Sequence, residues 1–362
     1  MKLNFLTSIV LTISNITLFF STFSALAAAE HKIFTSVDSY SYSEPTSIDS
    51  FINKFNGDIT NGEHAVSLSQ IEFGFQKNNL TFSLIRRYDY LYEFSSDTAR
   101  FYYQTENDVP FSGQQDYQLY LKASHFDASG VKLSYDWDVT PDINVTVAAS
   151  YLEAKDFYQG KFSGPASWDS EDDFTVDAPG HIYSAHNLLL TYPETDATGK
   201  GTSADFSLGW NISEHWQFGL SVKDIWSKIK WQEALYSQVN RWEVHRLDED
   251  GELDSRPLLE GATLNYQQKL PRRSKANLAY KTSSGITWYS QFFHSEYFLH
   301  KSIGVTLPFN EEHRFSMAWH IDAKAIELGY AMKFGHIRLM SDSSSSKEIK
   351  ALALSANLSI PF

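Results

Sequence analysis

Charged side chains recur at alternate positions in many short segments of this 362-residue chain. In residues 131–139, for example, Lys132, Asp136 and Asp138 alternate with large apolar residues. This spacing places the charges on one face of a β-strand and the apolar side chains on the other. Charges of both signs on a shared face could pair with one another, or line an aqueous path and select the solutes that follow it. The candidate positions are Glu72, Arg87, Asp89, Glu93, Lys122, Asp136, Asp138, Lys281, Arg314, Glu327 and Lys333.

Catalytic chemistry has weaker support in the sequence. His294 and Ser295 are adjacent, but a His-Ser pair alone lacks the geometry of nucleophile, base and orienting group that catalysis requires. The chain has no Cys, no Gly-rich phosphate loop and no His-Glu-x-x-His pair. The acidic run 248–252 lacks the spacing of a calcium loop, and we interpret it as a solvated loop. We therefore expect no catalytic residue, no metal site and no cofactor.

The elements that must position these charges are strands. Clean period-2 alternation is found in 131–139, 204–212, 314–322, 326–334 and 352–362. Weaker alternation is found in 65–76, 80–94, 115–126, 143–157, 182–192, 215–231, 261–270, 275–282, 286–295 and 299–308. Short turns such as Lys77-Asn78-Asn79 join several of them. The pattern predicts an all-β chain of about fourteen strands, within a range of about twelve to sixteen.

The two ends of the N-terminal region differ in character. Lys2 precedes a largely apolar stretch from Leu3 to Phe23, and small-x-small patterns at Ala27 and Ala29 follow. This combination predicts a signal peptide over 1–29, cleaved near Ala27 to Ala29, and a retained anchor helix is the alternative. Residues 30–64 are Ser-rich and contain one helical spacing, which we interpret either as a short plug helix or as part of a disordered leader. The plug candidates are Ile48, Phe51, Ile52 and Phe55.

Three connections are expected to be long and polar: 96–112, 158–181 and 232–260. The last two carry acidic clusters, Asp169 to Asp173 and Asp248 to Asp254. Long loops at one rim and short turns at the other are typical of a membrane barrel. With the strands assigned above, however, strict alternation of direction does not bring all three loops to one side.

Composition favours a barrel in a membrane. A net charge of −14 argues against a nucleic-acid partner, and a mean hydropathy of −0.34 argues against a bundle of transmembrane helices. Yet 15% of the residues are aromatic, and rings such as Tyr88, Trp216 and Trp226 cluster near strand ends. A closed barrel in lipid accounts for both facts, with an outer aromatic girdle and a polar interior. We predict a single barrel over 65–362; a secreted β-sandwich or adhesin is the soluble alternative.

The last strand resembles the C-terminal signal of Gram-negative outer-membrane β-barrel proteins. Those proteins typically end in an aromatic residue with a hydrophobic residue two before it, as Phe362 and Ile360 do here, and Leu358 continues the series. Asn357 stands where that pattern usually has Gly. The resemblance implies a place in the outer membrane, contact with its lipid, and insertion by the barrel-assembly machinery. The expected strand number and plug are also similar to the fatty-acid-channel family of fourteen-stranded transporters, although that family's glycine-rich N-terminal motif is missing.

The favoured function is passage of a small or amphipathic solute through the barrel. One alternative is a closed structural or surface-interaction barrel that acts through long acidic loops. A second alternative is an outer-membrane enzyme that modifies lipid, with His294 as its first candidate residue. The sequence does not identify the solute.

Overall fold

A computed structural model describes residues 31–362, apart from 108, 110–111, 171–172, 187–196 and 246–253. The predicted signal peptide and its cleavage site fall outside the described residues. The described chain is dominated by strands, with two helices, α2 (Ile48–Ile52) and α3 (Ser96–Asn107). Neither of these helices is long and apolar enough to span a membrane.

The strands form one closed antiparallel ring. β1 (His31–Ser43) pairs with β2 (His64–Lys77) on one side and with β17 (Ala351–Pro361) on the other, which closes the sheet. The remaining strands are β3 (Leu80–Phe94), β4 (Asp116–Thr140), β5 (Ile143–Ser170), β6 (Asp173–Val176), β7 (Gly180–Ser184), β8 (Thr198–Asn211), β9 (Trp216–His245), β10 (Asp254–Gln268), β11 (Arg273–Lys281), β12 (Thr287–Ser295), β13 (Phe298–Pro308), β14 (Arg314–His320), β15 (Ala325–Met332) and β16 (Gly335–Ser341).

Two places in the ring are filled by interrupted strands. β6, β7 and β8 follow one another between β5 and β9, and β10 and β11 follow one another between β9 and β12. With each series taken as one strand, the ring has fourteen strands. The prediction of a single all-β antiparallel barrel of about fourteen strands is confirmed.

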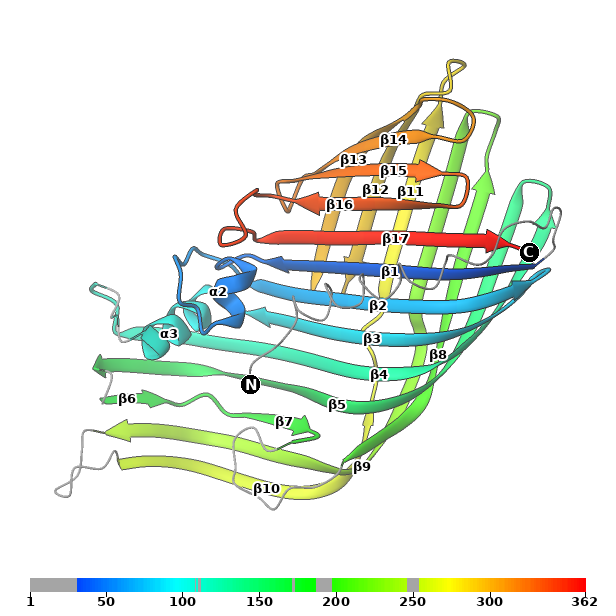
Figure 1. The fold of residues 1–362 in the computed structure, drawn as a ribbon. Helices are drawn as coiled ribbons and strands as arrows, with labels where there is room; N and C mark the ends of the chain where they lie inside the picture. The colour runs from blue at the N-terminus through cyan, green and yellow to red at the C-terminus, as the bar shows by residue number, and fades with distance from the viewer. Residues whose placement is uncertain (1–30, 108, 110–111, 171–172, 187–196, 246–253) are drawn as a thin grey trace.

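The barrel has a turn end and a loop end. The C-terminus and the short turns, such as that at Asn78 and Asn79, lie at the turn end, on the right of Figure 1. The helices and the C-terminal ends of β5 and β9 lie at the loop end, on the left. The described parts of the three regions predicted as long connections therefore share one end. The expected loops are wrong in extent, because β5 continues to Ser170, β9 continues to His245 and β10 begins at Asp254.

The ring is taller on one side than on the other. The tall wall comprises β4 to β10, in which β4, β5 and β9 have 25, 28 and 30 residues. The low wall comprises β12 to β17, whose strands have seven to eleven residues. β1 to β3 join the two walls, and the tall wall extends far past the low wall at the loop end (Figure 1).

A band of exposed apolar side chains surrounds the barrel near its turn end. It includes Leu84, Trp137, Trp226 and Leu328, each on the strand face that points away from the lumen. In β4 the exposed large apolar residues are confined to Val131–Val139. Nearer the loop end the same outward face of β4 is covered, because Phe101 of α3 packs against Tyr117. The tall wall therefore carries the exposed apolar band near the turn end, and its outer face is covered nearer the loop end.

The N-terminal segment belongs to the wall, which corrects the predicted boundary of the barrel at residue 65. β1 starts at His31, and its ladders to β2 and β17 are continuous. The predicted helix exists as α2, with Ser47 capping it, because Ser47 Oγ accepts the amide of Ser50. It does not plug the lumen: Phe51 packs against Tyr92, which lies on the same outward strand face as Leu84. Phe55 contacts Tyr102 of α3, so the two helices cover the outer wall together.

Candidate functional site

Four charged side chains meet inside the barrel near mid-height. Arg87 of β3 donates from Nη1 and Nη2 to the two carboxylate oxygens of Asp224 on β9, at 2.9 and 2.6 Å. Its Nε donates to Asp89 at 2.7 Å. Arg273 donates to Asp89 at 3.0 Å and to Asp224 at 3.3 Å. All four residues are buried, and each charge faces an opposite one, which is the condition for retaining ionised groups away from water.

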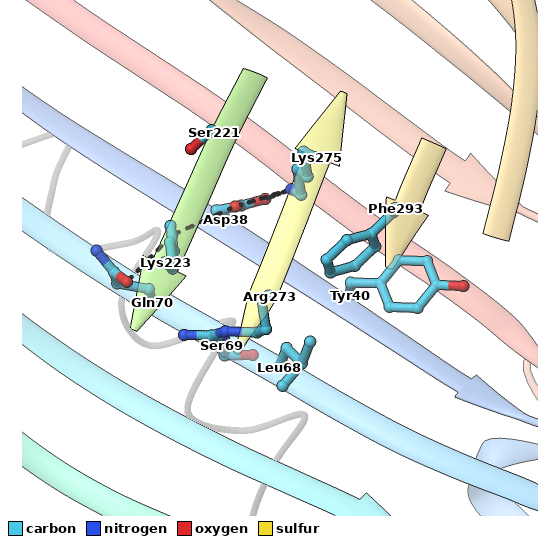
Figure 2. Close-up of a pocket in the computed structure, with 10 residues that line it drawn as sticks. All are labelled: Asp38, Tyr40, Leu68, Ser69, Gln70, Ser221, Lys223, Arg273, Lys275 and Phe293. Carbon is cyan, nitrogen blue, oxygen red and sulfur yellow. Dashed lines mark hydrogen bonds and ion pairs between the residues drawn. The ribbon is translucent and has the colours of Figure 1, made fainter. Parts of the chain in front are cut away.

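A second group of charges continues this layer toward β1. Lys275 Nζ lies 3.2 Å from Asp38, and Lys223 Nζ lies 3.9 Å from the same carboxylate and 3.2 Å from Gln70 Oε1 (Figure 2). β1 and β11 are diametrically opposite in the ring, so the contact between Asp38 and Lys275 crosses the lumen. The hollow among these side chains is about 30 Å³, which has room for one or two waters. Together, these two groups of charges form what we call the ionic layer.

A local irregularity in β9 makes the ionic layer possible. Asp224 has a left-handed backbone with φ of 57°, and the β8–β9 register shifts beside it, between Ala204 and Phe206. Such a bulge re-aims a side chain relative to the regular alternation. The amide of Asp224 donates to Asp205, and Ser203 Oγ donates to the Asp224 carboxylate at 2.6 Å. The bulge therefore directs Asp224 toward β3, four places away in the ring.

Apolar clusters fill the lumen above the ionic layer. On the tall wall Phe157 stacks on Trp231, with ring centres 4.0 Å apart, and both side chains are buried. A second buried cluster lies on the side of β1 and includes Tyr40, Leu68 and Phe298. The axis of the barrel is therefore occupied by side chains over both heights.

The wall itself is interrupted where the ionic layer meets β9. β9 pairs with β11 up to Lys223 and with β10 from Ile229 onward, so residues 224–228 have no ladder partner on that side. The opposite segment, 269–272, contains Pro271, which has no amide hydrogen to donate to a ladder. In place of a ladder bond, the amide of Leu270 donates to Ser227 Oγ at 2.9 Å.

A hollow of about 650 Å³ opens at this interruption. Its lip includes Trp226 and Ile225, which belong to the exposed apolar band. Its floor includes Leu270, which is 5% exposed and packs into the inner cluster of Phe157 and Trp231. Asp224 also lines the hollow, so the hollow reaches from the outer face to the ionic layer.

The sequence-predicted lumen residues separate into two groups in the structure. Arg87 and Asp89 are in the ionic layer, and Glu72 is buried nearby, where it pairs with Lys132 and accepts from Ser83 at 2.7 Å. Farther along the inner face, Glu327 lies 3.4 Å from His320. Lys132 and His320, the partners of Glu72 and Glu327, are not among the predicted positions.

The other predicted positions lie toward the two ends. Glu93 and Glu296 share Lys122 near the loop end, at 3.9 and 3.6 Å. Asp136 accepts from Thr146 at 2.6 Å. The exposed positions near the turn end are Asp138, Lys281, Arg314 and Lys333. Among these four, Lys333 pairs locally, since its Nζ lies 3.4 Å from Glu312 of a neighbouring turn.

Sequence reasoning missed most of the ionic layer. Asp38 was assigned to a leader rather than to a strand, so its partners Lys223 and Lys275 had no reason to be singled out. Asp224 and Arg273 flank the irregular region of β9 and β11, where simple alternation fails. The signal that could have identified this region is Pro271 within an otherwise alternating segment.

Two further sequence features are resolved by the faces of the strands. Arg86 points outward, where it pairs with Asp127 at 2.6 Å and lies 4.6 Å from the ring centre of Tyr88. His294 is exposed and Ser295 is buried, as expected for neighbours on opposite faces of β12. The adjacent His and Ser therefore do not present their side chains to one site.

The last strand lies in the wall between β1 and β16. Leu358 and Ile360 pair with Thr35 and Ile33 of β1, and their side chains share the outward face. Phe362 is exposed beside Phe75, with ring centres 5.8 Å apart. These positions are accessible from outside the closed barrel.

No protein-family model matches the sequence, and no curated protein is significantly similar to it. Among solved structures, the toluene transporter TodX of Pseudomonas putida matches with 10% identity and a TM-score of 0.41, over 93% of this chain and 91% of that chain. The toluene transporter TbuX of Ralstonia pickettii matches with 10% identity and a TM-score of 0.43, over 93% and 90%. A FadL homologue of Pseudomonas aeruginosa matches with 8% identity and a TM-score of 0.35, over 91% and 87%. At these values the likeness transfers neither a family name nor a solute.

Proposed function

We propose that this protein is an outer-membrane barrel that lets a small amphipathic solute pass through the side of its wall. The observation that carries the proposal is the hollow at the interruption between β9 and β10–β11, which connects the apolar band with the ionic layer. The loop end is then extracellular and the turn end periplasmic, as in barrels with long external loops. Export through a signal peptide cleaved near Ala27 to Ala29, and assembly through Leu358, Ile360 and Phe362, belong to the same proposal.

A simple water-filled pore does not fit the interior. The contact between Asp38 and Lys275 crosses the lumen, and the hollow beside it holds one or two waters. A hydrated ion that followed the axis would have to separate buried ion pairs, which is costly because each charge would lose its partner. The axis is therefore closed to such solutes in this conformation.

The side hollow suits a molecule with an apolar body and a polar end. Trp226, Ile225 and Leu270 supply apolar surface, while Ser227 and Asp224 supply polar atoms at the inner end. Ligand sites commonly combine apolar walls with a few placed polar groups. An amphipathic solute could leave the lipid along the apolar lip and place its polar end against the ionic layer.

The floor of the hollow is also the part of the wall with the weakest backbone pairing. Residues 224–228 and 269–272 share no ladder, and the bond from Leu270 to Ser227 Oγ is a single side-chain contact. Segments with few backbone hydrogen bonds open at low free-energy cost. Movement of Leu270 would connect the hollow to the inner cluster.

A reversible lock tests this route. The chain has no native Cys, so Ser227→Cys with Leu270→Cys gives a single disulfide across the hollow. The measurement is uptake of a medium-chain fatty acid and of toluene into proteoliposomes, with glucose as the hydrophilic comparison. We expect the oxidised Ser227→Cys, Leu270→Cys variant to lose most of its uptake of the two apolar solutes. Reduction of the disulfide should restore that uptake.

The matched control is Ser41→Cys with Ser67→Cys, which joins regularly paired β1 and β2 where the two hydroxyls lie 2.9 Å apart. This disulfide should leave uptake unchanged. Full uptake by the oxidised Ser227–Leu270 variant would contradict the side route. Absence of uptake by the unmodified protein would instead support the second candidate, a closed barrel that acts through its projecting wall, which the filled lumen also favours.

A further inference from the structure

Three basic side chains border the outer side of the hollow. Lys228 lies on β9, and Lys269 and Arg272 lie in the segment that joins β10 to β11. Lys269 and Arg272 are exposed and Lys228 is half-buried. Within the part of the chain that the structure describes, none of the three has an ion pair with an acid. Unpaired cations around a hollow distinguish this place from the ionic layer, where every cation has a partner.

Their height on the wall is set by the apolar run of β9. Outward residues are aromatic or aliphatic from Trp216 to Trp226, and basic residues follow at Lys228 and Lys230. A tilted strand crosses a bilayer in about nine to eleven residues, and aromatic rings mark both interfaces. The run fits this length, with a Trp at each end. The three cations therefore lie at the headgroup level of the outer leaflet, next to the exposed indole of Trp226.

The acids nearby leave a net positive charge at this rim. Asp224 accepts from both Arg87 and Arg273, and Glu296 lies 3.6 Å from Lys122. His294 also lines the hollow and carries no negative charge. In a chain of net charge −14, this rim is a local cationic site.

We propose that this rim binds the phosphate group of a phosphorylated glycolipid of the outer leaflet. Arg272 can hold two phosphate oxygens at once, and Lys228 and Lys269 add point charges on the two sides of the gap. The acyl chains would lie along Trp226 and the apolar band below it. The lipid thereby bridges β9 and the β10–β11 segment where the backbone ladder is missing.

The inference rests on the outer-membrane placement in the proposed function and is independent of solute passage. Binding without passage would contradict only the side route, and passage without binding would contradict only the lipid site. The two outcomes are measured on the same purified full-length chain.

The test is a titration of the detergent-solubilised protein with bis-phosphorylated lipid A. Thermophoresis and native mass spectrometry measure the binding. The variant replaces Lys228, Lys269 and Arg272 with Gln. We expect its affinity to fall at least about tenfold, since each basic residue near an anionic lipid surface contributes on the order of one kcal/mol. The control replaces Lys77, Lys281 and Arg314 with Gln; these exposed cations lie near the turn end, and their loss should leave affinity unchanged.

Three results would overturn the proposal: equal binding by the Lys228 triple variant, an equal loss in the Lys77 control, or equal binding of lipid A from which both phosphates have been removed. Competition by inorganic phosphate at the concentration of the lipid would overturn the lipid assignment in favour of a free anion. A heat-dependent gel shift of each variant checks that the barrel has folded. If the triple variant does not fold, single Lys269→Gln and Arg272→Gln variants should each weaken binding about fivefold.

Discussion

The low wall and the tall wall use the same alternating pattern at two lengths. Strands of the low wall have seven to eleven residues, and Leu328 and Met317 on its outer face are exposed. β4 of the tall wall has 25 residues, and only Val131–Val139 carry exposed large apolar side chains. The difference shows that one strand can have an exposed apolar outer face at one height and a covered outer face at another.

The upper part of the tall wall is packed on both faces. On its inner face Phe157 stacks on Trp231, and on its outer face Tyr117 packs against Phe101 of α3. A wall surrounded by lipid outside and polar side chains inside has no need of such packing. The tall wall above the band therefore resembles a soluble sheet in its construction.

Irregular backbone is concentrated where the tall wall changes character. Asp224 and Glu233 of β9 are left-handed, and register shifts occur in the ladders of β4–β5, β8–β9 and β9–β10. The described ladders from β12 to β17 contain no register shift. The hollow and the ionic layer lie in this irregular zone, so the tall wall carries the functional candidates.

The largest contrast is expected between buried Asp224 of the tall wall and half-buried Glu327 of the low wall. Asp224→Asn removes the carboxylate that two buried arginines share, and leaving a buried charge uncompensated costs about 3–5 kcal/mol. Glu327→Gln disturbs a single contact to His320 on the low wall and should cost about 0.5–1.5 kcal/mol. The measurement is urea unfolding of both variants in detergent. Equal losses would show that the ionic layer does not anchor the tall wall.

The next contrast concerns outward positions at two heights. Leu328→Arg places a charge in the apolar band of the low wall, where Leu328 is 60% exposed, and should cost about 2–4 kcal/mol in lipid. Thr263→Arg places the same side chain on an exposed position of β10 above the band, and should change stability by less than about 0.5 kcal/mol. Folding in lipid vesicles measures both. A large cost at Thr263 would mean that the membrane covers the tall wall to a greater height.

Removing the ion pair that crosses the lumen tests its role in closing the lumen separately from its role in the stability of the barrel. Asp38→Ser with Lys275→Ser deletes both charges of a half-exposed pair, and Lys223→Gln in the same variant avoids leaving the second lysine without its acid, so the free energy of unfolding should fall by no more than about 1 kcal/mol. Single-channel recordings in planar bilayers should then show conductance steps that the unmodified protein lacks, because water replaces the pair. Unchanged recordings would place the closure in the apolar clusters instead.

The smallest effect is expected at the seam between β1 and β2, at the loop end. A hydrogen bond with Glu44, 3.3 Å away, raises the pKa of His64 above its usual 6.5, although burial opposes the shift. A raised folded-state pKa stabilises the protein below about pH 6.5, and this contribution disappears as pH rises through the folded value. His64→Gln should remove a pH dependence of about 1 kcal/mol or less. Urea unfolding at pH 5.5 and pH 8 measures it; an unchanged pH dependence in the variant would contradict the assignment.

The residues of the low wall show how much was predictable from sequence. Alternation from Ile326 to Phe334 and from Leu352 to Phe362 identified strands and their apolar face, because a period of two has one structural meaning when repeated over this length. The tall wall was predicted less well. Residues 158–181 and 232–260 look polar and lack clean alternation, although the structure pairs β5 with β7 and β9 with β10 there.

The sequence by itself determined the all-β class, the alternation of the strands and the short α2 helix, because each depends on local spacing and capping. The tertiary structure decided which charges meet. Asp38 and Lys275 are 237 positions apart, and Arg87 and Asp224 are 137 apart. Closure of the ring places them across one lumen, and a bulge at Asp224 directs its carboxylate toward Arg87. Such contacts depend on the register of the whole ring, and no local pattern records that register.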